Sequence, residues 1–285
     1  MHVTNPYQDC PACGSLTKPN PIYRKSGYEI VRCSDCGLGR TALNDHFDPA
    51  TIYSRDYFEG NQSDGYADYL GSESVLRREF RNVVKSLLRQ GRTSGNLFEI
   101  GCAYGFFLME ACKYFDVHGC ELAVEASGHC RSQGLDVVTG TVTEECMSQR
   151  GPLDVVVMLD VIEHLVEPLE VLRMASRSLN RGGHILISTG DWDSLLSRVM
   201  GSAWRLMTPP QHLFFFSYRT MNSILSRAGF RVVHFSRPAK LVPLSLAVFQ
   251  LTRMLGLRSR PMPSLDAYCL PINLFDAMRV IAVKT

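Results

Sequence analysis

Two pairs of cysteines near the start of the sequence have the spacing of metal ligands. Cys10 and Cys13 form one C-x-x-C hook, Cys33 and Cys36 form another, and nineteen residues separate the two hooks. A glycine follows each hook and permits a tight turn in which backbone amides face the sulfurs. Four thiolates complete the tetrahedral coordination that Zn²⁺ prefers in structural sites. We therefore predict a structural zinc ion; a redox pair of dithiols is the alternative, and no neighbouring residue supports it.

A second stretch, residues 97–105, reads as a buried strand that passes through glycines into a helix. Its pattern is Glu99-x-Gly101-x-x-x-Gly105, and apolar residues at helical spacing follow it. Glycine lets a ligand approach the backbone closely, and the N–H groups of a helix N-terminus favour electron-rich atoms. The pattern predicts a site for a nucleotide-like ligand, although its spacing differs from the G-x-G-x-x-G of dinucleotide enzymes. A generic strand–turn–helix is the alternative.

An acidic residue, Glu121, ends the next expected strand, 22 positions after Glu99. A carboxylate at this place can accept hydrogen bonds from both hydroxyls of a ribose. The alternative is a solvated residue at the start of a helix. Because a glycine loop precedes the strand, we predict that Glu121 binds a cofactor.

These residues resemble the class I S-adenosylmethionine-dependent methyltransferases. The pattern from Glu99 to Gly105 looks like their first motif, except that Ala103 stands where the family usually has glycine. The stretch 160–164 (Asp-Val-Ile-Glu-His) and the Gly182-Gly183 turn resemble the ubiquinone-biosynthesis-like and sugar-modifying branches of that family. The resemblance is strongest over residues 97–190, and zinc-bearing small-molecule methyltransferases have similar aromatic segments after their zinc hooks.

The resemblance implies S-adenosylmethionine as cofactor and a set of residues that contact it. These residues are Glu99, Gly101, Ala103, Tyr104, Gly105, Glu121, Leu122, Thr141, Val142, Asp160 and, in the aromatic segment, Tyr66. Because ligands bind at the carboxyl ends of parallel strands, Asp160, Glu163 and His164 should lie near the cofactor. Glu163 and His164 could equally begin a helix.

The elements that must hold these residues alternate between strands and helices. Strands are expected at 97–100, 117–121, 136–138, 153–159, 184–189, 230–235 and 273–283, the last of them antiparallel, with helices at 72–88, 123–133, 168–179 and 218–228. This alternation predicts an α/β fold with a doubly wound, seven-stranded, mostly parallel sheet. The cysteine hooks would form a small N-terminal Cys₄ zinc ribbon.

We divide the chain into a zinc ribbon (1–46), an aromatic segment with an amphipathic helix (47–92) and a cofactor-binding domain (93–285) with insertions at 190–217 and 237–271. The aromatic segment suits a lid over a ligand, or it is a linker whose tyrosines pack on the surface. The first insertion breaks all periodicity and carries tryptophans, paired prolines and a phenylalanine cluster, as expected of a wall that faces the substrate.

Two histidines are catalytic candidates. His212 could act as a general base, since its ordinary pKa of about 6.5 suits proton removal near neutral pH. We favour the alternative, a histidine that satisfies backbone groups at the entry of a helix. His164 is the second candidate.

Composition and charge limit the partners. The 285 residues carry a formal net charge of +2, and residues 1–50 hold five basic and five acidic side chains. A nucleic-acid module normally carries a basic face, so the neutral ribbon is expected to shape or cover a site instead. No apolar run opens the sequence, and none spans about 18 residues, so we expect neither a signal peptide nor a transmembrane helix. Six cysteines are scattered through segments that read as core, which is typical of a reducing compartment, and we expect a cytoplasmic protein. The apolar helix expected at 241–257 could pack in the core, form a homodimer contact or lie on a membrane.

The resemblance implies an enzyme that methylates a small-molecule acceptor, such as a sugar nucleotide, a glycan precursor or a natural product. Two alternatives stay open. The protein could methylate RNA held by the ribbon, or it could be a non-catalytic scaffold on the same fold.

Overall fold

A computed structural model describes residues 9–16, 18–43, 69–243, 248 and 269–285. Tyr66, most of the predicted aromatic segment and most of the helix expected at 241–257 lie outside the described residues. In the described part of the chain, no helix combines the length and the apolar character needed to cross a bilayer.

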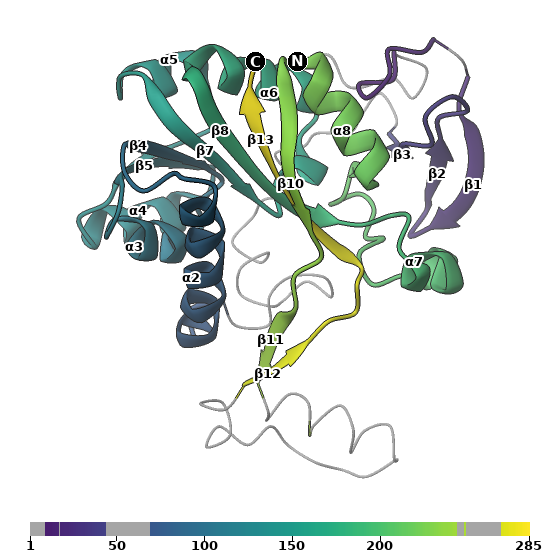
Figure 1. Cartoon of the computed structure of the whole chain (residues 1–285). Coiled ribbons are helices and arrows are strands. Elements are labelled where there is room, and N and C mark those ends of the chain that lie inside the picture. Colours follow the sequence, from purple (N-terminus) through teal and green to yellow (C-terminus); the bar gives the residue numbers. More distant parts are fainter. Residues whose placement is uncertain (1–8, 17, 44–68, 244–247, 249–268) are drawn as a thin grey trace.

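A seven-stranded sheet forms the centre of the molecule, with the strand order β10-β13-β8-β7-β4-β5-β6 (Figure 1). The strands are β4 (Asn96–Ile100), β5 (Asp116–Glu121), β6 (Asp136–Thr139), β7 (Leu153–Leu159), β8 (Leu179–Gly190), β10 (Phe230–Ser236) and β13 (Ala277–Lys284). β13 pairs antiparallel with both β8 and β10, while the other pairings are parallel. The predicted doubly wound, mostly parallel sheet is confirmed.

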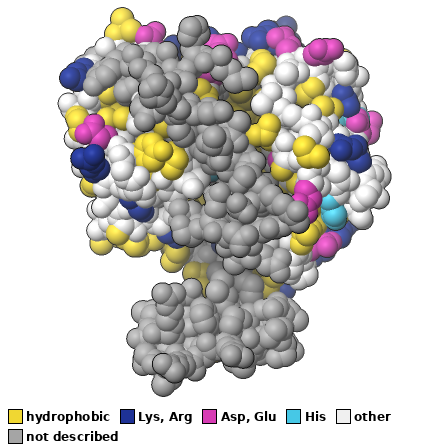
Figure 2. Space-filling view, turned by 180° about the vertical axis from the view of Figure 1, so that it is seen from behind, with side chains coloured by type: hydrophobic (Ala, Val, Ile, Leu, Met, Phe, Trp, Pro, Cys, Tyr) yellow, Lys and Arg dark blue, Asp and Glu magenta, His cyan; other side chains and the backbone are white. Residues whose placement is uncertain are grey.

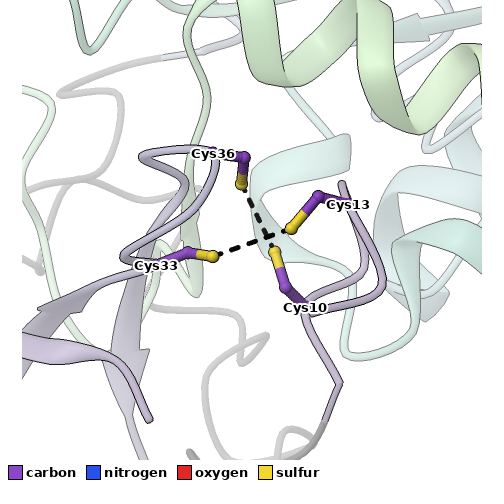
Figure 3. A group of neighbouring side chains, drawn as sticks. All are labelled: Cys10, Cys13, Cys33 and Cys36. Carbon is purple, nitrogen blue, oxygen red and sulfur yellow. Dashed lines mark hydrogen bonds between the residues drawn. The ribbon is translucent and has the colours of Figure 1, made fainter. Parts of the chain in front are cut away.

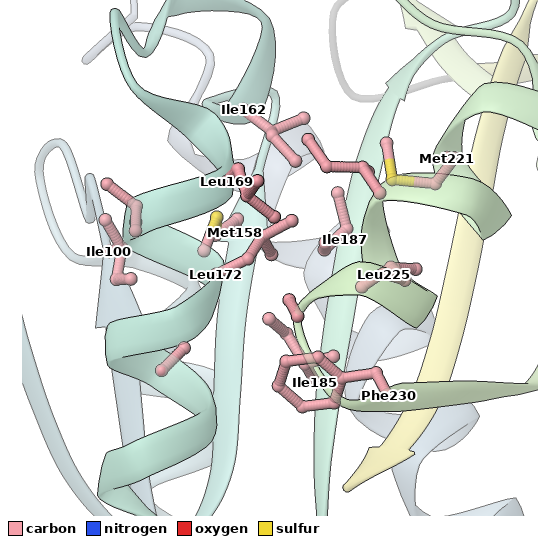
Figure 4. Close-up of a cluster of buried hydrophobic side chains, with 14 of the residues drawn as sticks. Ile100, Met158, Ile162, Leu169, Leu172, Ile185, Ile187, Met221, Leu225 and Phe230 are labelled. Carbon is pink, nitrogen blue, oxygen red and sulfur yellow. The ribbon is translucent and has the colours of Figure 1, made fainter. Parts of the chain in front are cut away.

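Helices cover both faces of this sheet, because successive strand residues point to opposite sides. Leu97 of β4 packs with the cluster that includes α2 (Glu73–Arg89) and α3 (Phe106–Ala111), whereas Phe98 packs with the cluster of α6 (Pro168–Ser178) and α8 (Tyr218–Arg227). Figure 4 shows the second cluster, in which Leu172 and Leu225 meet Ile187 over the sheet. α4 (Val124–Ser132) and α5 (Glu144–Ser148) complete the two layers.

The predicted ribbon is a small antiparallel sheet built from β1 (Asn20–Lys25), β2 (Tyr28–Arg32) and β3 (Gly39–Ala42). A fourth strand, β9 (Phe214–Phe215), joins it from the distant first insertion and pairs with β3. Thr41 adds two bonds, from its amide to the Leu213 carbonyl at 2.9 Å and from its hydroxyl to the His212 carbonyl at 2.7 Å. The ribbon is therefore continuous with the cofactor-binding domain, a connection that the sequence did not indicate.

Several local expectations were wrong. The first insertion, expected to be irregular, contains α7 (Leu195–Met200), the short 3₁₀ helix η3 (Gly201–Ala203) and β9. The Gly182-Gly183 turn is present, with a positive φ at Gly182, but the strand that it was expected to precede, β8, begins earlier, at Leu179. The helix expected from residue 241 begins instead as β11 (Lys240–Pro243), which pairs with β12 (Cys269–Ile272). Cys112, taken as a core cysteine, is exposed.

Candidate functional site

The loop after β4 has a backbone that mostly requires glycine. Gly101, Ala103 and Gly105 have φ angles of +72°, +46° and +78°. A Cβ atom at Gly101 would lie 2.7 Å from Val161 Cγ2, and one at Gly105 would lie 2.6 Å from Leu135 Cδ1. Both glycines are thus required by conformation and by packing. Ala103 adopts the same left-handed conformation with a side chain, which is strained.

Glu121 lies at the carboxyl end of β5 and reaches back to this loop. Its Oε2 atom accepts a hydrogen bond from the Ala103 amide at 2.9 Å, and Oε1 accepts one from the Ala123 amide at 2.8 Å. Burial raises the pKa of the carboxyl, and the backbone amides oppose that shift. A carboxylate has about four acceptor positions, so acceptor capacity remains for a hydroxyl donor of a ligand.

Glu99 lies beneath the loop and is buried. Its Oε2 atom has no hydrogen-bond partner within the described residues. Burial raises the pKa of Glu99 well above its usual range, and the nearby Cys130 and Glu121 add to the shift. A buried polar atom without a partner is costly. A ligand donor could satisfy it, so the loop and its two carboxyls fit a cofactor that carries hydroxyl and amine groups.

Aromatic rings pack beside the loop. Tyr104 is buried, and Tyr69 stacks on it with ring centroids 5.7 Å apart and on Phe106 at 5.5 Å. Tyr69 is the described end of the predicted aromatic segment, so at least this end packs on the glycine loop.

The remaining residues expected at the cofactor are spread along the same edge of the sheet. Leu122 follows β5 and is exposed, as is Thr141, while Val142 is half-buried against the core. Asp160 ends β7 with a left-handed φ of +56°.

Asp160 has two partners that the sequence analysis missed. Ser188 donates its hydroxyl to Oδ1 at 2.9 Å, and the Lys240 ammonium lies 3.3 Å from Oδ2. Burial would raise the pKa of Asp160, but Lys240 and Ser188 together hold it below its usual value. Lys240 lies 80 residues away in β11, and no local pattern links it to Asp160.

The four hook cysteines come together in the ribbon (Figure 3). The sulfur of Cys10 lies 3.5 Å from that of Cys36, and the sulfur of Cys13 lies 3.7 Å from that of Cys33. Thiolates around a tetrahedral zinc ion, with Zn–S bonds near 2.3 Å, are separated by about 3.8 Å. The arrangement is therefore compatible with a zinc ribbon.

A second cluster lies where the short 3₁₀ helix η2 (Ile162–His164) meets the insertion before β9. Glu163, His164 and His212 place one potential ligand atom each within 4.8 Å of one another. His164 Nδ1 lies 2.8 Å from the Gln211 carbonyl oxygen, and His212 Nδ1 lies 2.7 Å from that of Leu206. Because a carbonyl oxygen only accepts, each Nδ1 carries the proton and each Nε2 carries the lone pair.

Burial shifts the pKa values of this cluster strongly. It raises the pKa of Glu163 to about 8, with the charge of Asp160 adding to the effect. It lowers the pKa of His212 to about 3, helped by His164. The hydrogen bond from His212 to the Leu206 carbonyl agrees with the alternative in which this histidine satisfies backbone groups at the entry of a helix. The role of His212 as a general base stays a prediction.

A cavity of about 420 Å³ opens between the ribbon and the first insertion. Its walls are mostly aromatic and aliphatic, with two arginines and one aspartate: Ile22, Tyr23, Arg32, Trp192, Asp193, Ser197, Arg198, Trp204 and Met207. The guanidinium groups of Arg32 and Arg198 each lie 3.5 Å from Asp193. Trp204 also lines a much smaller cavity beside Glu163 and His212, so the two spaces share a wall.

Figure 2 shows no separate clusters of basic or acidic side chains among the described residues on this face. Among the described residues drawn there, basic and acidic side chains are interspersed. A surface that binds nucleic acid would instead show a basic patch, and the described residues drawn on this face form none.

Comparison with known proteins identifies relatives of one kind. The family model described as a methyltransferase domain matches residues 73–235. The ubiquinone biosynthesis O-methyltransferase of Methylococcus capsulatus is 28% identical over 173 residues, which are 58% of this chain and 71% of that protein. The protein of the same name from Caulobacter vibrioides is 32% identical over 124 residues, 41% of this chain, and the match spans about half (48%) of its length.

Solved structures share the fold at low identity. Magnesium protoporphyrin IX methyltransferase from Synechocystis, solved with S-adenosylhomocysteine, is 16% identical with a TM-score of 0.51 and covers 84% of this chain and 100% of its own. A S-adenosylmethionine-dependent methyltransferase from Archaeoglobus fulgidus is 18% identical with a TM-score of 0.53, covering 76% and 100%. At this identity, the structures support the fold alone.

Proposed function

The chain belongs to the methyltransferase domain family, and on that premise we propose that it transfers a methyl group from S-adenosylmethionine to a hydroxyl of a small molecule. It is a class I enzyme by its sheet order and its family. The hydroxyl acceptor is our inference, supported by relatives that are named O-methyltransferases.

One observation carries the proposal most directly, namely that Glu121 reaches across to the glycine loop. Its carboxylate lies against the loop amide of Ala103 and retains acceptor capacity for the ribose hydroxyls. Glu99, with its unpartnered Oε2, would accept from the amine of the cofactor. When bound, S-adenosylmethionine supplies a methyl group already activated on a sulfonium.

The protein then has to align an acceptor and exclude water. Alignment of two reactants can contribute about 7–11 kcal/mol. Asp160, held by Ser188 and Lys240, lies at the end of β7 on the cofactor edge of the sheet. Its fixed carboxylate would orient polar groups of the bound molecules.

We place the acceptor in the cavity of about 420 Å³ between the ribbon and the insertion. Trp192 and Tyr23 would pack on a ring of the acceptor. Arg32 and Arg198 share the single carboxylate of Asp193, so a net positive charge remains to bind an acidic group of the acceptor. A sugar nucleotide or a phosphorylated precursor has both features. This placement gives the ribbon a role in holding the acceptor.

The ribbon would hold one structural zinc ion through Cys10, Cys13, Cys33 and Cys36. Four thiolates leave no open coordination position, so the ion would stabilise the ribbon and take no part in the reaction.

Calorimetric titration with S-adenosylhomocysteine tests the cofactor, and methyl transfer from labelled S-adenosylmethionine to a panel of sugar nucleotides and phosphorylated precursors tests the acceptor. We expect one-to-one binding and a labelled O-methyl product. Absence of binding by the folded protein would overturn the proposal. Labelling of RNA, with an affinity that falls steeply as salt rises, would replace the small-molecule acceptor with RNA.

A further inference from the structure

The cluster of Glu163, His164 and His212 has the chemistry of a second metal site, distinct from the cysteine hooks. We propose that these three side chains bind one divalent first-row transition-metal ion beside the acceptor cavity. The binding itself is independent of the proposed methyl transfer, whereas the role of the ion in catalysis rests on that function.

The first argument is the orientation of the two imidazoles. Each ring donates its Nδ1 proton to a backbone carbonyl, that of Gln211 for His164 and that of Leu206 for His212. Metal-binding histidines typically donate their second ring nitrogen in this way, which fixes the ring and its tautomer. The ring centroids lie 4.7 Å apart at an interplanar angle of 78°, so both rings belong to one compact group.

The second argument is the carboxyl group of Glu163, which lies close to both imidazoles. Glu163 is only 4% exposed, and its Oε2 atom has no hydrogen-bond partner within the described residues. Burial of a polar atom without a partner is costly, so such an atom in a native structure requires an explanation. Coordination of a cation at this oxygen would supply one.

The third argument is space. A cavity of about 10 Å³ is lined by Glu163, His212, Thr189 and the insertion residues next to them. This volume is close to that of a single water-sized sphere. It is too small for an organic ligand but suits one ion.

The ligand set also indicates the class of ion. Two imidazole nitrogens and one carboxylate suit Zn²⁺, Co²⁺, Mn²⁺ or Fe²⁺ better than Mg²⁺ or Ca²⁺, which prefer oxygen ligands throughout. Three protein ligands leave at least one coordination position open. Trp204 lines both the small cavity of this cluster and the acceptor cavity. An acceptor oxygen could take the open position once the Trp204 side chain moves aside, and a cation there would lower the pKa of a hydroxyl.

Calorimetry on the full chain tests the proposal. The protein is first loaded with one equivalent of Zn²⁺, which the thiolates bind, and is then titrated with Co²⁺. We expect one further saturable site per chain. The isosteric variant Glu163→Gln and the variant His212→Gln should weaken Co²⁺ binding at least tenfold, while the matched variant His234→Gln, which alters a half-buried histidine in β10, should not.

Two controls make each outcome decisive. Binding of S-adenosylhomocysteine and the thermal midpoint, measured on the same variants, report whether they fold. Absence of a second site in the wild-type protein, or equal Co²⁺ affinity in folded Glu163→Gln and wild-type proteins, would overturn the metal site. Either result would leave the methyltransferase proposal intact, because S-adenosylhomocysteine binding is measured separately.

Discussion

The Oε2 atom of Glu121 lies 2.9 Å from the amide nitrogen of Ala103. This hydrogen bond joins the end of β5 to the loop that follows β4, and the two residues are 18 positions apart in the chain. It ties the conformation of the glycine loop to the carboxylate that we assign to the ribose. The residue that we propose to bind the cofactor therefore also fixes the backbone of the glycine loop.

Replacement of Glu121 should weaken cofactor binding. Hydrogen bonds to a charged group contribute about 1.5–3 kcal/mol each, so Glu121→Ala should lower the affinity for S-adenosylhomocysteine at least tenfold. Glu121→Gln should have an intermediate effect, because its amide keeps one acceptor oxygen. Calorimetric titration measures the affinity of each variant for S-adenosylhomocysteine. The variant Glu125→Ala, at an exposed neighbouring residue, is the control. Equal affinities for Glu121→Ala, Glu121→Gln and Glu125→Ala would refute the assignment.

Ala103→Gly should stabilise the protein. A non-glycine residue at a φ of +46° is strained by about 1–2 kcal/mol. The substitution removes this strain, but part of the gain in stability is offset by the greater freedom of glycine in the unfolded chain. We expect the free energy of unfolding to rise by about 0.5–1 kcal/mol, measured by urea denaturation. Gly134→Ala, which introduces a side chain at a φ of +78° with nothing within 4 Å, should have the opposite sign. A loss of stability in Ala103→Gly would contradict the strain argument.

Asp276→Ala should destabilise the wall of the acceptor cavity. The buried carboxylate of Asp276 accepts from the indole nitrogen of Trp204 at 3.0 Å and from two guanidinium nitrogens of Arg205 at 2.9 Å. Its loss leaves the indole N–H buried without its acceptor.

Because Arg205 is partly exposed, solvent screens its ion pair with Asp276, and this pair contributes less to the free energy of unfolding. We expect a loss of about 2–4 kcal/mol in the free energy of unfolding. The control Asp193→Ala removes exposed pairs and should cost less than about 1 kcal/mol. Similar losses in the two variants would show that the bonds to Trp204 and Arg205 carry little energy.

Cys13→Ser should release the ion from the ribbon. A tetrahedral site that loses one of four thiolates binds zinc much more weakly, so atomic absorption should find one zinc ion fewer per chain than in the wild type. The variant Cys112→Ser, at an exposed cysteine outside the ribbon, should retain the wild-type content. Unchanged zinc in Cys13→Ser would exclude the four-cysteine site.

The sequence predicted the sheet because its signals are local. The apolar run of β7 and the glycines after β4 each lie within a few residues, and the periodicity of α8 fixed that helix to within one residue. The hook cysteines were found in the same way. The site was harder to predict, since the partners of Asp160 come from β8 and β11 and only the tertiary fold brings Lys240 to it.

The pairing of β9 could not be predicted because a two-residue strand has no periodicity. The cluster of Glu163, His164 and His212, which we propose as a metal site, was missed for a related reason. Glu163 and His164 are adjacent in sequence, but His212 lies 48 residues beyond His164, and the spacing of the three matches no short motif.

The pairing of β3 with β9 makes the ribbon a support for the backbone of the first insertion. Phe214 and Phe215 are bonded to the ribbon strand, and His212 lies two residues before them with its carbonyl held by Thr41. Partial unfolding of the ribbon would therefore loosen the backbone that carries this histidine. If the ribbon holds the zinc ion that we propose, removal of zinc should lower turnover before the central sheet unfolds, and the rate of methyl transfer would then depend on the zinc available.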